Sequence, residues 1–115
     1  MVNFRDKPLA QRKKEVEQIL KRFPDKIPIL LTKSKSTHIS NIDKEKFLVP
    51  NNMTVGEFMY MIRKRIILES HQAIYIFFNN NLVNTSALMS EIYMNYKDKD
   101  DEMLYASYAG ENTFG

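Results

Sequence analysis

The sequence predicts an α+β domain in which an amphipathic helix packs against a small mixed sheet. Three observations support this prediction. The chain has 115 residues, which suits a single domain with one hydrophobic core. Segments with the helical spacing of apolar residues are interspersed with short branched and aromatic runs that are typical of strands. Only 3 glycines and 4 prolines are present, so we expect one folded unit without disordered linkers.

The first predicted element is a helix within residues 1–24, which we expect to form an N-terminal helical extension. Its apolar residues follow the i, i+3, i+4, i+7 spacing of one helical face, at Val16, Ile19, Leu20 and Phe23. Pro8 near the start and Pro24 after the end mark the limits of the helix.

Two strands are predicted next. Residues 27–33, IPILLTK, form a continuous branched run, which indicates a strand buried on both faces or nearly so. Residues 34–41 form the loop after it. Residues 46–50, KFLVP, indicate a second, short strand. Because proline cannot donate a ladder hydrogen bond, Pro50 places this strand at a sheet edge or at a strand end.

The second helix has the clearest start signal in the chain. Thr54 and Glu57 have the spacing of a capping box, in which each side chain bonds the other residue's backbone N–H group. An apolar stripe follows at Val55, Phe58, Met59, Ile62 and Ile66. We therefore expect a helix that begins at Thr54.

The remaining elements are a strand over residues 73–78, a turn at residues 79–81, a short helix over about residues 86–96, and a last strand over residues 103–109. After the first helix, the order is strand, strand, helix, strand, helix, strand. This order is compatible with the β-grasp of ubiquitin. We expect residues 25–115 to form such a domain, with an exposed C-terminal tail.

The composition excludes several classes of protein. No cysteine is present, which excludes disulfides, a thiol nucleophile and cysteine-ligated zinc. His38 and His71 are solitary, and neither a glycine-rich loop nor a nucleophile elbow accompanies them. We therefore expect no enzyme, no catalytic residue, no metal and no cofactor. No apolar run reaches the length of a signal peptide or a membrane span, which indicates a soluble, cytoplasmic chain.

The charge is modest in sum but uneven along the chain. The net charge of +3 is low for a nucleic-acid-binding protein, so we expect no nucleic-acid partner. Residues 1–24 carry seven Lys and Arg against three Asp and Glu, whereas residues 91–115 carry two against six. This asymmetry suggests two faces with different partners.

Six segments, taken together, are specific to one family. IDKEKFLVP, TVGEF, IRKRI, LMSEIY, KDKD and the terminal ENTFG occur in this order and spacing. They resemble the autophagy-related protein eight family, the ubiquitin-like modifiers of autophagic membranes. The resemblance extends from about Arg12 to Gly115 and includes the helical extension that ubiquitin lacks.

The resemblance implies a protein that is a substrate of enzymes. In the family a cysteine protease exposes a C-terminal glycine, which is adenylated, passed as a thioester between an activating and a conjugating enzyme, and joined to phosphatidylethanolamine. The attachment point here would be Gly115, with Thr113 and Phe114 as the tail that enters these enzymes. Glycine suits this role because it has no side chain to hinder a nucleophile at its carbonyl group. Whether Gly115 is encoded as the last residue or exposed by cleavage stays open.

The resemblance also implies a surface for peptides that carry an aromatic residue, two variable residues and an aliphatic residue. Such a peptide would add a strand beside residues 46–50, whose edge offers unpaired N–H and C=O groups. The aromatic pocket would be lined by Glu15, Ile19, Pro28, Leu30, Lys46, Leu48 and Met103. The aliphatic pocket would be lined by Phe47, Val49, Pro50, Met53, Phe58, Ile62 and Arg65. Phe58 and Ile62 also lie on the apolar stripe of their helix, so each is as much a candidate for the core.

Further surfaces follow from the same resemblance. Lys44, Arg63 and Lys64 would form a basic rim that attracts acidic residues beside the peptide motif. A second docking surface would involve the strand around Tyr75, Ile76 and Phe77, although strand alternation turns half of these side chains toward the core. The family commonly has an aromatic residue where Met103 falls, and DKDDEML holds one residue more than the usual spacing. A flexible thioether would make the aromatic pocket softer or wider.

Two alternatives to the lipid modifier stay open. The chain could modify protein lysines, although it lacks the basic double-glycine tail of ubiquitin. It could also act as a trafficking or cytoskeletal adaptor without conjugation. For the lipid modifier we expect a monomer in solution, cytoplasmic when free and on autophagosomal or related vesicle membranes when lipidated.

Overall fold

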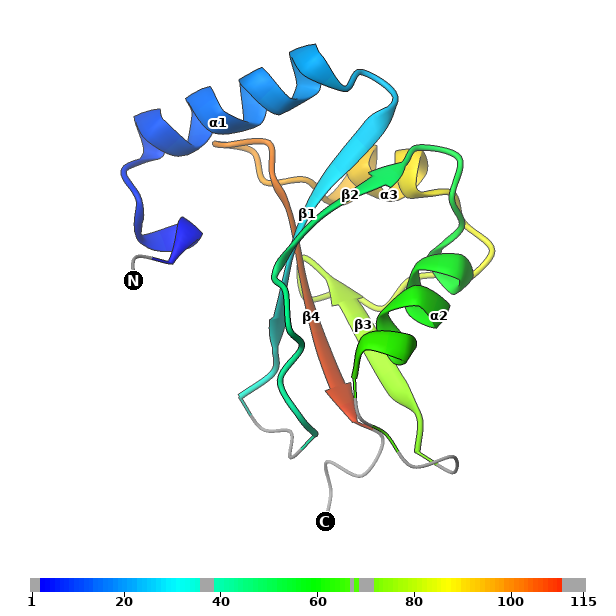
Figure 1. Ribbon diagram of the computed structural model, residues 1–115. Coiled ribbons are helices and arrows are strands. Elements are labelled where there is room, and N and C mark those ends of the chain that lie inside the picture. The colour runs from blue at the N-terminus through cyan, green and yellow to red at the C-terminus, as the bar shows by residue number, and fades with distance from the viewer. Residues whose placement is uncertain (1–2, 36–38, 67, 69–71, 111–115) are drawn as a thin grey trace.

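The computed structural model describes residues 3–35, 39–66, 68 and 72–110. A single sheet runs through the molecule, with helices on both of its faces (Figure 1). The elements in chain order are the 3-10 helix η1 (Phe4–Asp6), α1 (Leu9–Arg22), β1 (Lys26–Lys33), β2 (Lys46–Pro50), α2 (Val55–Arg65), β3 (Ile74–Phe78), α3 (Met89–Tyr96) and β4 (Leu104–Gly110).

The sheet has the strand order β2-β1-β4-β3. The central strands β1 and β4 are parallel, with Ile29 opposite Leu104 and Lys33 opposite Tyr108. The outer strands β2 and β3 pair antiparallel with β1 and β4, respectively. This mixed sheet with a helix across one face is the predicted ubiquitin-like fold with an N-terminal helix, so the predicted fold class is confirmed.

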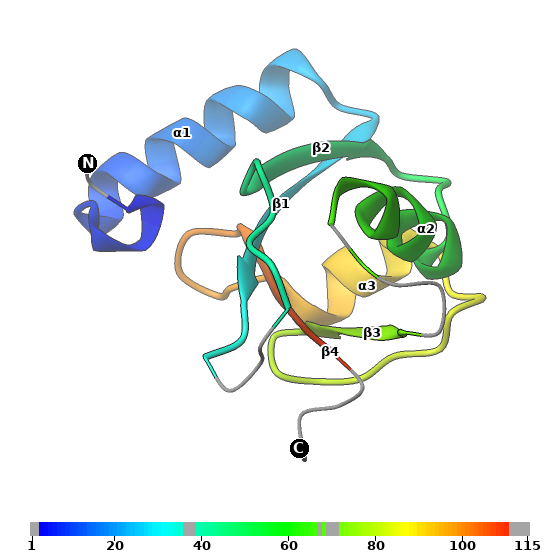
Figure 2. The ribbon, with the colours of Figure 1, turned by 60° about the horizontal axis from the view of Figure 1, so that its bottom comes forward.

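The main core lies between the sheet and the pair α2 and α3, which cover the same face (Figure 2). Phe58 of α2 contacts Phe47 of β2 edge to face at 6.0 Å between ring centroids, and it lies 6.1 Å from the ring of Phe78. The capping box at the start of α2 is present, because Thr54 Oγ1 accepts from the Glu57 N–H at 3.1 Å and Glu57 Oε1 accepts from the Thr54 N–H at 2.9 Å.

The face of the sheet opposite α2 and α3, called the outward face below, is only partly covered. Helix α1 lies across it and closes a second, smaller core, formed by Phe4, Val16, Leu30, Met103 and Tyr105 with Leu20 against it. Phe4 is contributed by η1, so the segment before α1 also packs on this face. None of the helices formed by the described residues lies over the lower part of this face (Figure 1).

The strand and helix limits follow the sequence predictions closely, with one clear difference. The helix predicted over about residues 86–96 begins at Met89. Asn84 Oδ1 accepts from the Ser86 N–H at 2.9 Å, and the Ala87 N–H donates to the Asn84 carbonyl at 3.1 Å. This turn uses the backbone N–H groups of Ser86 and Ala87, so the helix starts after it. The predicted turn at residues 79–81 is confirmed, since Asn79 and Asn80 have φ of 49° and 65° within a hairpin closed by Phe78 and Asn81.

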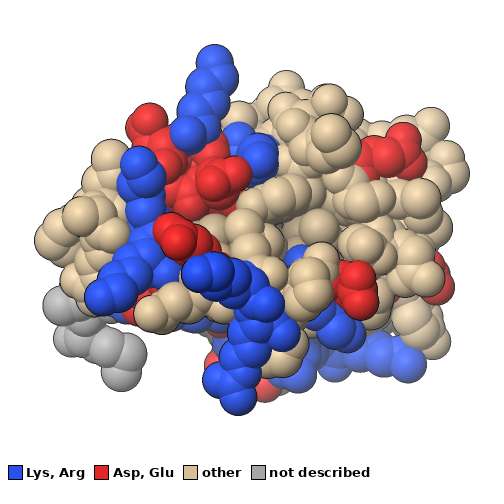
Figure 3. Space-filling model, turned by 90° about the horizontal axis from the view of Figure 1, so that it is seen from above, with Lys and Arg blue, Asp and Glu red and all other residues tan. Residues whose placement is uncertain are grey.

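The oppositely charged parts of the chain lie next to each other. Basic residues of α1 and acidic residues of the 97–103 loop line one cleft, among them Lys13, Lys21, Asp100 and Glu102. Viewed from above, acidic side chains form a compact group among basic ones (Figure 3). The suggestion of two separate faces is therefore wrong for these parts, because folding brings them together and they neutralise each other locally. None of the helices in the described ranges has the length and apolarity to cross a bilayer.

Candidate functional site

Strand β2 forms one edge of the sheet made by the described residues. Its side chains alternate as its sequence predicts: Lys46 and Leu48 are exposed, while Phe47 and Val49 are buried in the core. Pro50 ends the strand. An extended segment beside β2 would meet backbone N–H and C=O groups along the strand and the side chains of Lys46 and Leu48 on its outward face.

A cavity of about 160 Å³ opens beside this strand, between β1, β2, α1 and Met103, the residue before β4. Five of the seven residues predicted for the aromatic pocket line it: Ile19, Pro28, Lys46, Leu48 and Met103. Leu48 is 37% exposed and Met103 is 2% exposed, so the cavity runs from the surface into the second core. The structure thus brings together residues from four separate segments of the chain.

A second cavity of about 280 Å³ adjoins the first and shares Ile19, Lys46 and Met103 with it. Glu15 lines this second cavity, and its carboxylate accepts from Lys7 Nζ at 2.9 Å. Leu30, the remaining predicted residue, is buried in the second core under α1. The described residues therefore form a two-part groove on either side of Met103 and Lys46.

Five residues of the groove are absent from the predicted pockets and basic rim: Phe4, Gln18, Arg22, Phe23 and Ile29. For Gln18 and Arg22 the signal is present in the sequence, because residues 15, 18, 19 and 22 follow the i, i+3, i+4, i+7 spacing of one helical face. For Phe4 no local pattern exists, since it reaches the groove only because η1 folds back beneath α1.

The residues predicted for the aliphatic pocket cluster between β2 and α2. Phe47, Val49, Phe58 and Ile62 belong to the main core, and Phe58 and Ile62 are fully buried within it. Pro50 and Met53 are partly exposed, while Arg65 is exposed and forms an ion pair with Asp43 at 3.0 Å. The part of this set open to a ligand is therefore formed by Pro50, Met53 and Arg65.

The basic residues predicted for the rim divide between two places. Lys44 lies 5.0 Å from the ring centroid of Phe47 and lines the first cavity, so it is positioned at the groove. Lys64 lies 4.4 Å from the ring centroid of Tyr60, an exposed residue of α2. Arg63 is partly exposed on the same helix. Lys44 together with Lys46 therefore forms the cationic side of the groove.

The predicted second docking surface is split by strand alternation. Tyr75 is 41% exposed and Phe77 is partly exposed on the outward face, whereas Ile76 is 3% exposed and belongs to the main core. The predicted attachment residues Thr113, Phe114 and Gly115 lie outside the described residues, as do His38 and His71. Within the described ranges, no three His, Asp or Glu side chains are grouped to hold a metal ion.

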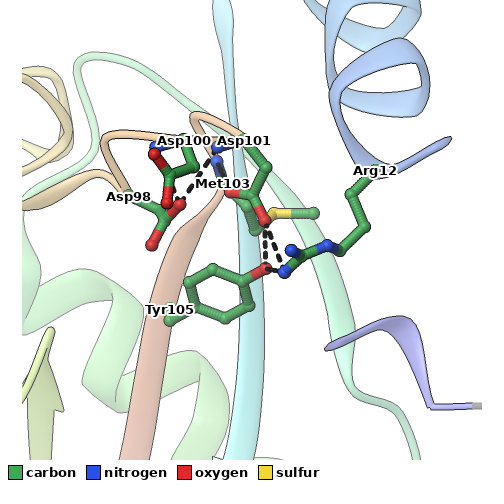
Figure 4. Close-up of polar contacts among 6 residues, drawn as sticks. All are labelled: Arg12, Asp98, Asp100, Asp101, Met103 and Tyr105. Atoms are coloured by element: carbon green, nitrogen blue, oxygen red, sulfur yellow. Dashed lines mark hydrogen bonds and ion pairs between the residues drawn. The ribbon is translucent and has the colours of Figure 1, made fainter. Parts of the chain in front are cut away.

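A buried polar cluster sets the position of α1 relative to the groove (Figure 4). Arg12 Nη1 of α1 lies 3.2 Å from Asp101 Oδ2, and the same carboxylate accepts a short hydrogen bond from the Tyr105 hydroxyl. Asp101 Oδ1 accepts from the Met103 N–H at 2.8 Å. One carboxylate therefore connects α1, which carries Ile19, to Met103 on the opposite wall of the groove.

Burial and hydrogen bonding change the pKa values of groups in this cluster. Burial, followed by the hydrogen bond and charge of Asp101, raises the pKa of Tyr105 to about 12. Burial would also raise the pKa of Asp98, but the N–H groups of Asp101 and Asp100, which donate to its Oδ2 at 3.0 Å each, outweigh it and hold that pKa below its usual range. At neutral pH, Tyr105 thus donates and Asp98 accepts.

Comparison with known proteins agrees with this fold and with the sequence resemblance. The family described as "Autophagy protein Atg8 ubiquitin like" matches residues 11–115. The chain belongs to the Atg8 family. It is 52% identical to autophagy-related protein 8 of Saccharomyces cerevisiae over 108 residues, which cover 94% of this chain and 92% of that protein. It is 47% identical to autophagy-related protein 8e of Arabidopsis thaliana over 110 residues, which cover 96% and 89% of the two chains.

A solved Atg8 structure has the same fold. The crystal structure of Trypanosoma brucei ATG8 superposes with a TM-score of 0.85 at 38% sequence identity, covering 95% of this chain and 93% of that one. The protein is therefore a ubiquitin-like autophagy protein of the Atg8 family, and α1 belongs to the part that is shared with the family.

Proposed function

We propose that this Atg8-family protein is joined through the carboxyl group of Gly115 to phosphatidylethanolamine and, on the membrane, recruits proteins that carry an aromatic-x-x-aliphatic motif. The observation that supports the binding half is the edge strand β2 beside the two-part groove. The motif would lie along β2, with its aromatic side chain in the cavity between Ile19, Leu48 and Met103.

The energetics favour a moderate, reversible interaction. Burying one aromatic and one aliphatic side chain contributes about 1.5–3 kcal/mol each, and the backbone hydrogen bonds of an added strand fix the register. Ordering the peptide opposes these gains, so we expect micromolar affinity. Lys44 and Lys46 attract acidic residues beside the motif, so the association rate falls as salt is raised.

Conjugation needs an activated carboxyl group, which the family's enzymes supply. ATP would adenylate the Gly115 carboxylate with release of pyrophosphate, and an enzyme thiol would then displace AMP from the acyl carbon to give a thioester. The amine of phosphatidylethanolamine then attacks the carbonyl carbon, an amide bond forms, the thiolate leaves and a proton is released. Processing by a cysteine protease precedes these steps if residues follow Gly115 in the translated chain. Gly115 suits attack at its carbonyl because it has no side chain.

The conjugation half is tested by Gly115→Ala in cells, followed by membrane fractionation. We expect the altered chain to remain in the supernatant and to form no puncta. The matched control is Gly110→Ala, which changes a glycine outside the terminal carboxyl group. Mass spectrometry of the conjugate identifies the amine: phosphatidylethanolamine supports the proposal, and a protein lysine overturns it. Membrane association by the Gly115→Ala chain equal to that of the unaltered chain also overturns it and favours an unconjugated adaptor.

The binding half is tested by titrating an aromatic-x-x-aliphatic peptide into the isotope-labelled chain and observing the backbone amides and side-chain methyl groups of the chain by NMR. New protection and amide shifts should concentrate on residues 46–49, with side-chain shifts at Ile19 and Met103. A peptide with both anchor residues replaced by alanine is the control and should leave these signals unchanged. Shifts confined to the β3 side of the sheet would show that this groove is not the motif site.

A further inference from the structure

A separate cavity lies on the outward face of the sheet, opposite α2. Its volume is about 360 Å³, and it lies between η1 and the turn that follows β3. The floor is formed by neighbouring outward-facing residues of the central strands, with Leu30 beside Tyr105 and Thr32 beside Ser107. Phe77 of β3, opposite Ser107, extends the floor. The peptide groove lies on the far side of the second core, around Met103.

The charged residues that line this cavity are all basic. Arg5, Lys33 and Lys35 line it, and no Asp or Glu is among the residues that the structure assigns to its lining. Outside the lining, Asp6 follows Arg5 in η1, and the charge of Arg5 also reaches Asp98, whose pKa it helps to lower. Because walls of low dielectric concentrate the field of such groups, the cavity favours an anion over a neutral or cationic ligand.

The arginine is held in place before any ligand arrives. Its guanidinium carbon lies 3.8 Å from the centroid of the Tyr105 ring, and the Tyr105 hydroxyl is itself held by Asp101. Stacking uses the face of a guanidinium and leaves its edge N–H groups able to donate in pairs to an oxyanion. Arg5 is therefore preorganised, so less side-chain entropy is lost when it binds.

The rest of the lining supplies neutral donors and an apolar surface. The hydroxyl-bearing residues Thr32 and Ser107 are adjacent in the β1–β4 register, and the amides of Asn79 and Asn80 border the same space. Leu30 and Phe77 provide apolar area beside them. Hydroxyl and amide groups can donate hydrogen bonds to phosphate oxygens. The apolar residues of the floor favour a ligand that also has an organic part over an inorganic ion.

We propose that this cavity binds a phosphate monoester, with the phosphate between Arg5 and the two lysines and the carbon body against Leu30 and Phe77. A phosphate monoester carries a charge of about −1.5 to −2 at neutral pH, which matches one guanidinium and two ammonium groups. The same chemistry occurs in soluble phosphate esters and in the headgroup of phosphatidic acid. This binding is independent of the peptide groove and of conjugation at Gly115.

The test uses the full chain and NMR of its backbone amides, with phenyl phosphate as the probe. Shifts are expected at Thr32, Asn79, Asn80 and Ser107, with saturation in the millimolar range. Inorganic phosphate and phenol, each lacking one half of the probe, should bind more weakly. Benzenesulfonate, which has the ring but only a single charge, should also bind more weakly. Equal shifts with benzenesulfonate, or no saturable shift with phenyl phosphate, would overturn the proposal.

Charge-removing variants make the test specific to the cavity. Arg5→Gln and Lys35→Gln should each weaken phenyl phosphate binding by at least about fivefold, because each removes a charge-assisted contact. Lys99→Gln removes the same charge from an exposed residue outside the cavity and should leave binding unchanged. Lys35 is exposed, so its variant should keep the thermal midpoint of the parent even if Arg5→Gln loosens η1. Equal binding by Lys35→Gln and the parent would overturn the proposal.

Vesicles distinguish the two sources of the ligand. Phosphatidylcholine vesicles that contain phosphatidic acid should broaden the same four amide signals if a lipid headgroup enters the cavity, and Lys35→Gln should reduce the broadening. If the vesicles have no effect but phenyl phosphate binding is saturable, the cavity is assigned to soluble phosphate esters. Leu48→Ala, which alters the peptide groove, should leave phenyl phosphate binding unchanged in either case. A failure of peptide binding or of conjugation therefore does not affect this result.

Discussion

Arg12 of α1 and Asp101 before β4 form an ion pair at 3.2 Å in which the carboxylate side chain is fully buried. The pair joins the N-terminal helix to the loop before the last strand. Asp101 also accepts from the Met103 N–H and from the Tyr105 hydroxyl, so its carboxylate is satisfied on both oxygens. This contact links two walls of the two-part groove, because Ile19 lies on α1 and Met103 lies two residues after Asp101.

Arg12→Met should lower the free energy of unfolding by about 2 kcal/mol, because it leaves the buried Asp101 carboxylate without its cation. The loss is moderated because Arg12 Nε is buried without a hydrogen-bond partner among the described residues. Urea unfolding measures the change. Lys14→Met, at an exposed position of the same helix, is the control and should have little effect. Equal losses for the two variants would show that the ion pair is not the cause.

The stability of the protein should fall as pH rises from about 10 to about 12. The pKa of Tyr105 is raised from 10.0 to about 12, first by burial and then by Asp101. Between these values the folded state keeps a proton that the unfolded state has lost, so folding becomes less favourable as pH increases. The pKa of Tyr93 is also raised to about 12, chiefly by burial, and adds to the decline.

Tyr105→Phe isolates the contribution of one hydroxyl. The variant should be less stable than the parent at neutral pH, because Asp101 loses a donor, and the difference should narrow as pH rises toward 12. Urea unfolding at a series of pH values measures both chains. Tyr60→Phe removes a hydroxyl from an exposed ring and is the control, which should change the stability little at neutral pH. A difference that widens with pH would contradict the assignment.

Glu102 has φ of 62°, in the left-handed region that disfavours a residue with a Cβ atom. Glu102→Gly should therefore be more stable than Glu102→Ala by about 1 kcal/mol. Both variants lose the exposed ion pair with Lys97 at 2.9 Å, so the comparison between them removes that effect. Thermal and urea unfolding of the two variants give the difference in stability. If the alanine variant is as stable as the glycine variant, the backbone at position 102 is not strained.

Leu48→Ala should weaken binding of an aromatic-x-x-aliphatic peptide by about tenfold, which corresponds to about 1.4 kcal/mol. Leu48 lines the cavity but is 37% exposed, so the fold should tolerate the change. Isothermal titration calorimetry measures the affinity. Leu82→Ala removes the same atoms from an exposed position that does not line either part of the groove and should bind like the parent. If the Leu48→Ala variant binds the peptide with unchanged affinity, the peptide site lies elsewhere on the protein.

Much of the fold is predictable because its signals are local. The capping box at Thr54 and Glu57, the apolar stripe of α2 and the prolines around α1 each involve residues within a few positions of one another. The limits of the third helix are harder to predict, since the turn at Asn84 competes with the helix for the same backbone donors. The tail residues that the family resemblance makes most important, Thr113 to Gly115, remain a prediction.

The lining of the groove could be predicted only in part from local sequence patterns. The family resemblance indicates most of its lining, and helical spacing could add Gln18 and Arg22, yet nothing near Phe4 in the sequence indicates that it borders the same cavity. The charge pattern is a similar case, because an uneven distribution along the chain suggests separate faces, whereas folding places α1 against the acidic 97–103 loop.

Periodicity, capping and composition were sufficient to place the helices and strands and to indicate the ubiquitin-like order. Contacts between distant segments settled the rest: the ion pair of Arg12 with Asp101, the burial of Phe58 and Ile62, and the basic cavity beneath η1. The physical reason is that backbone preferences and side-chain spacing act over a few residues, whereas ion pairs, cavities and burial depend on distances in space that only the packed sheet and helices set.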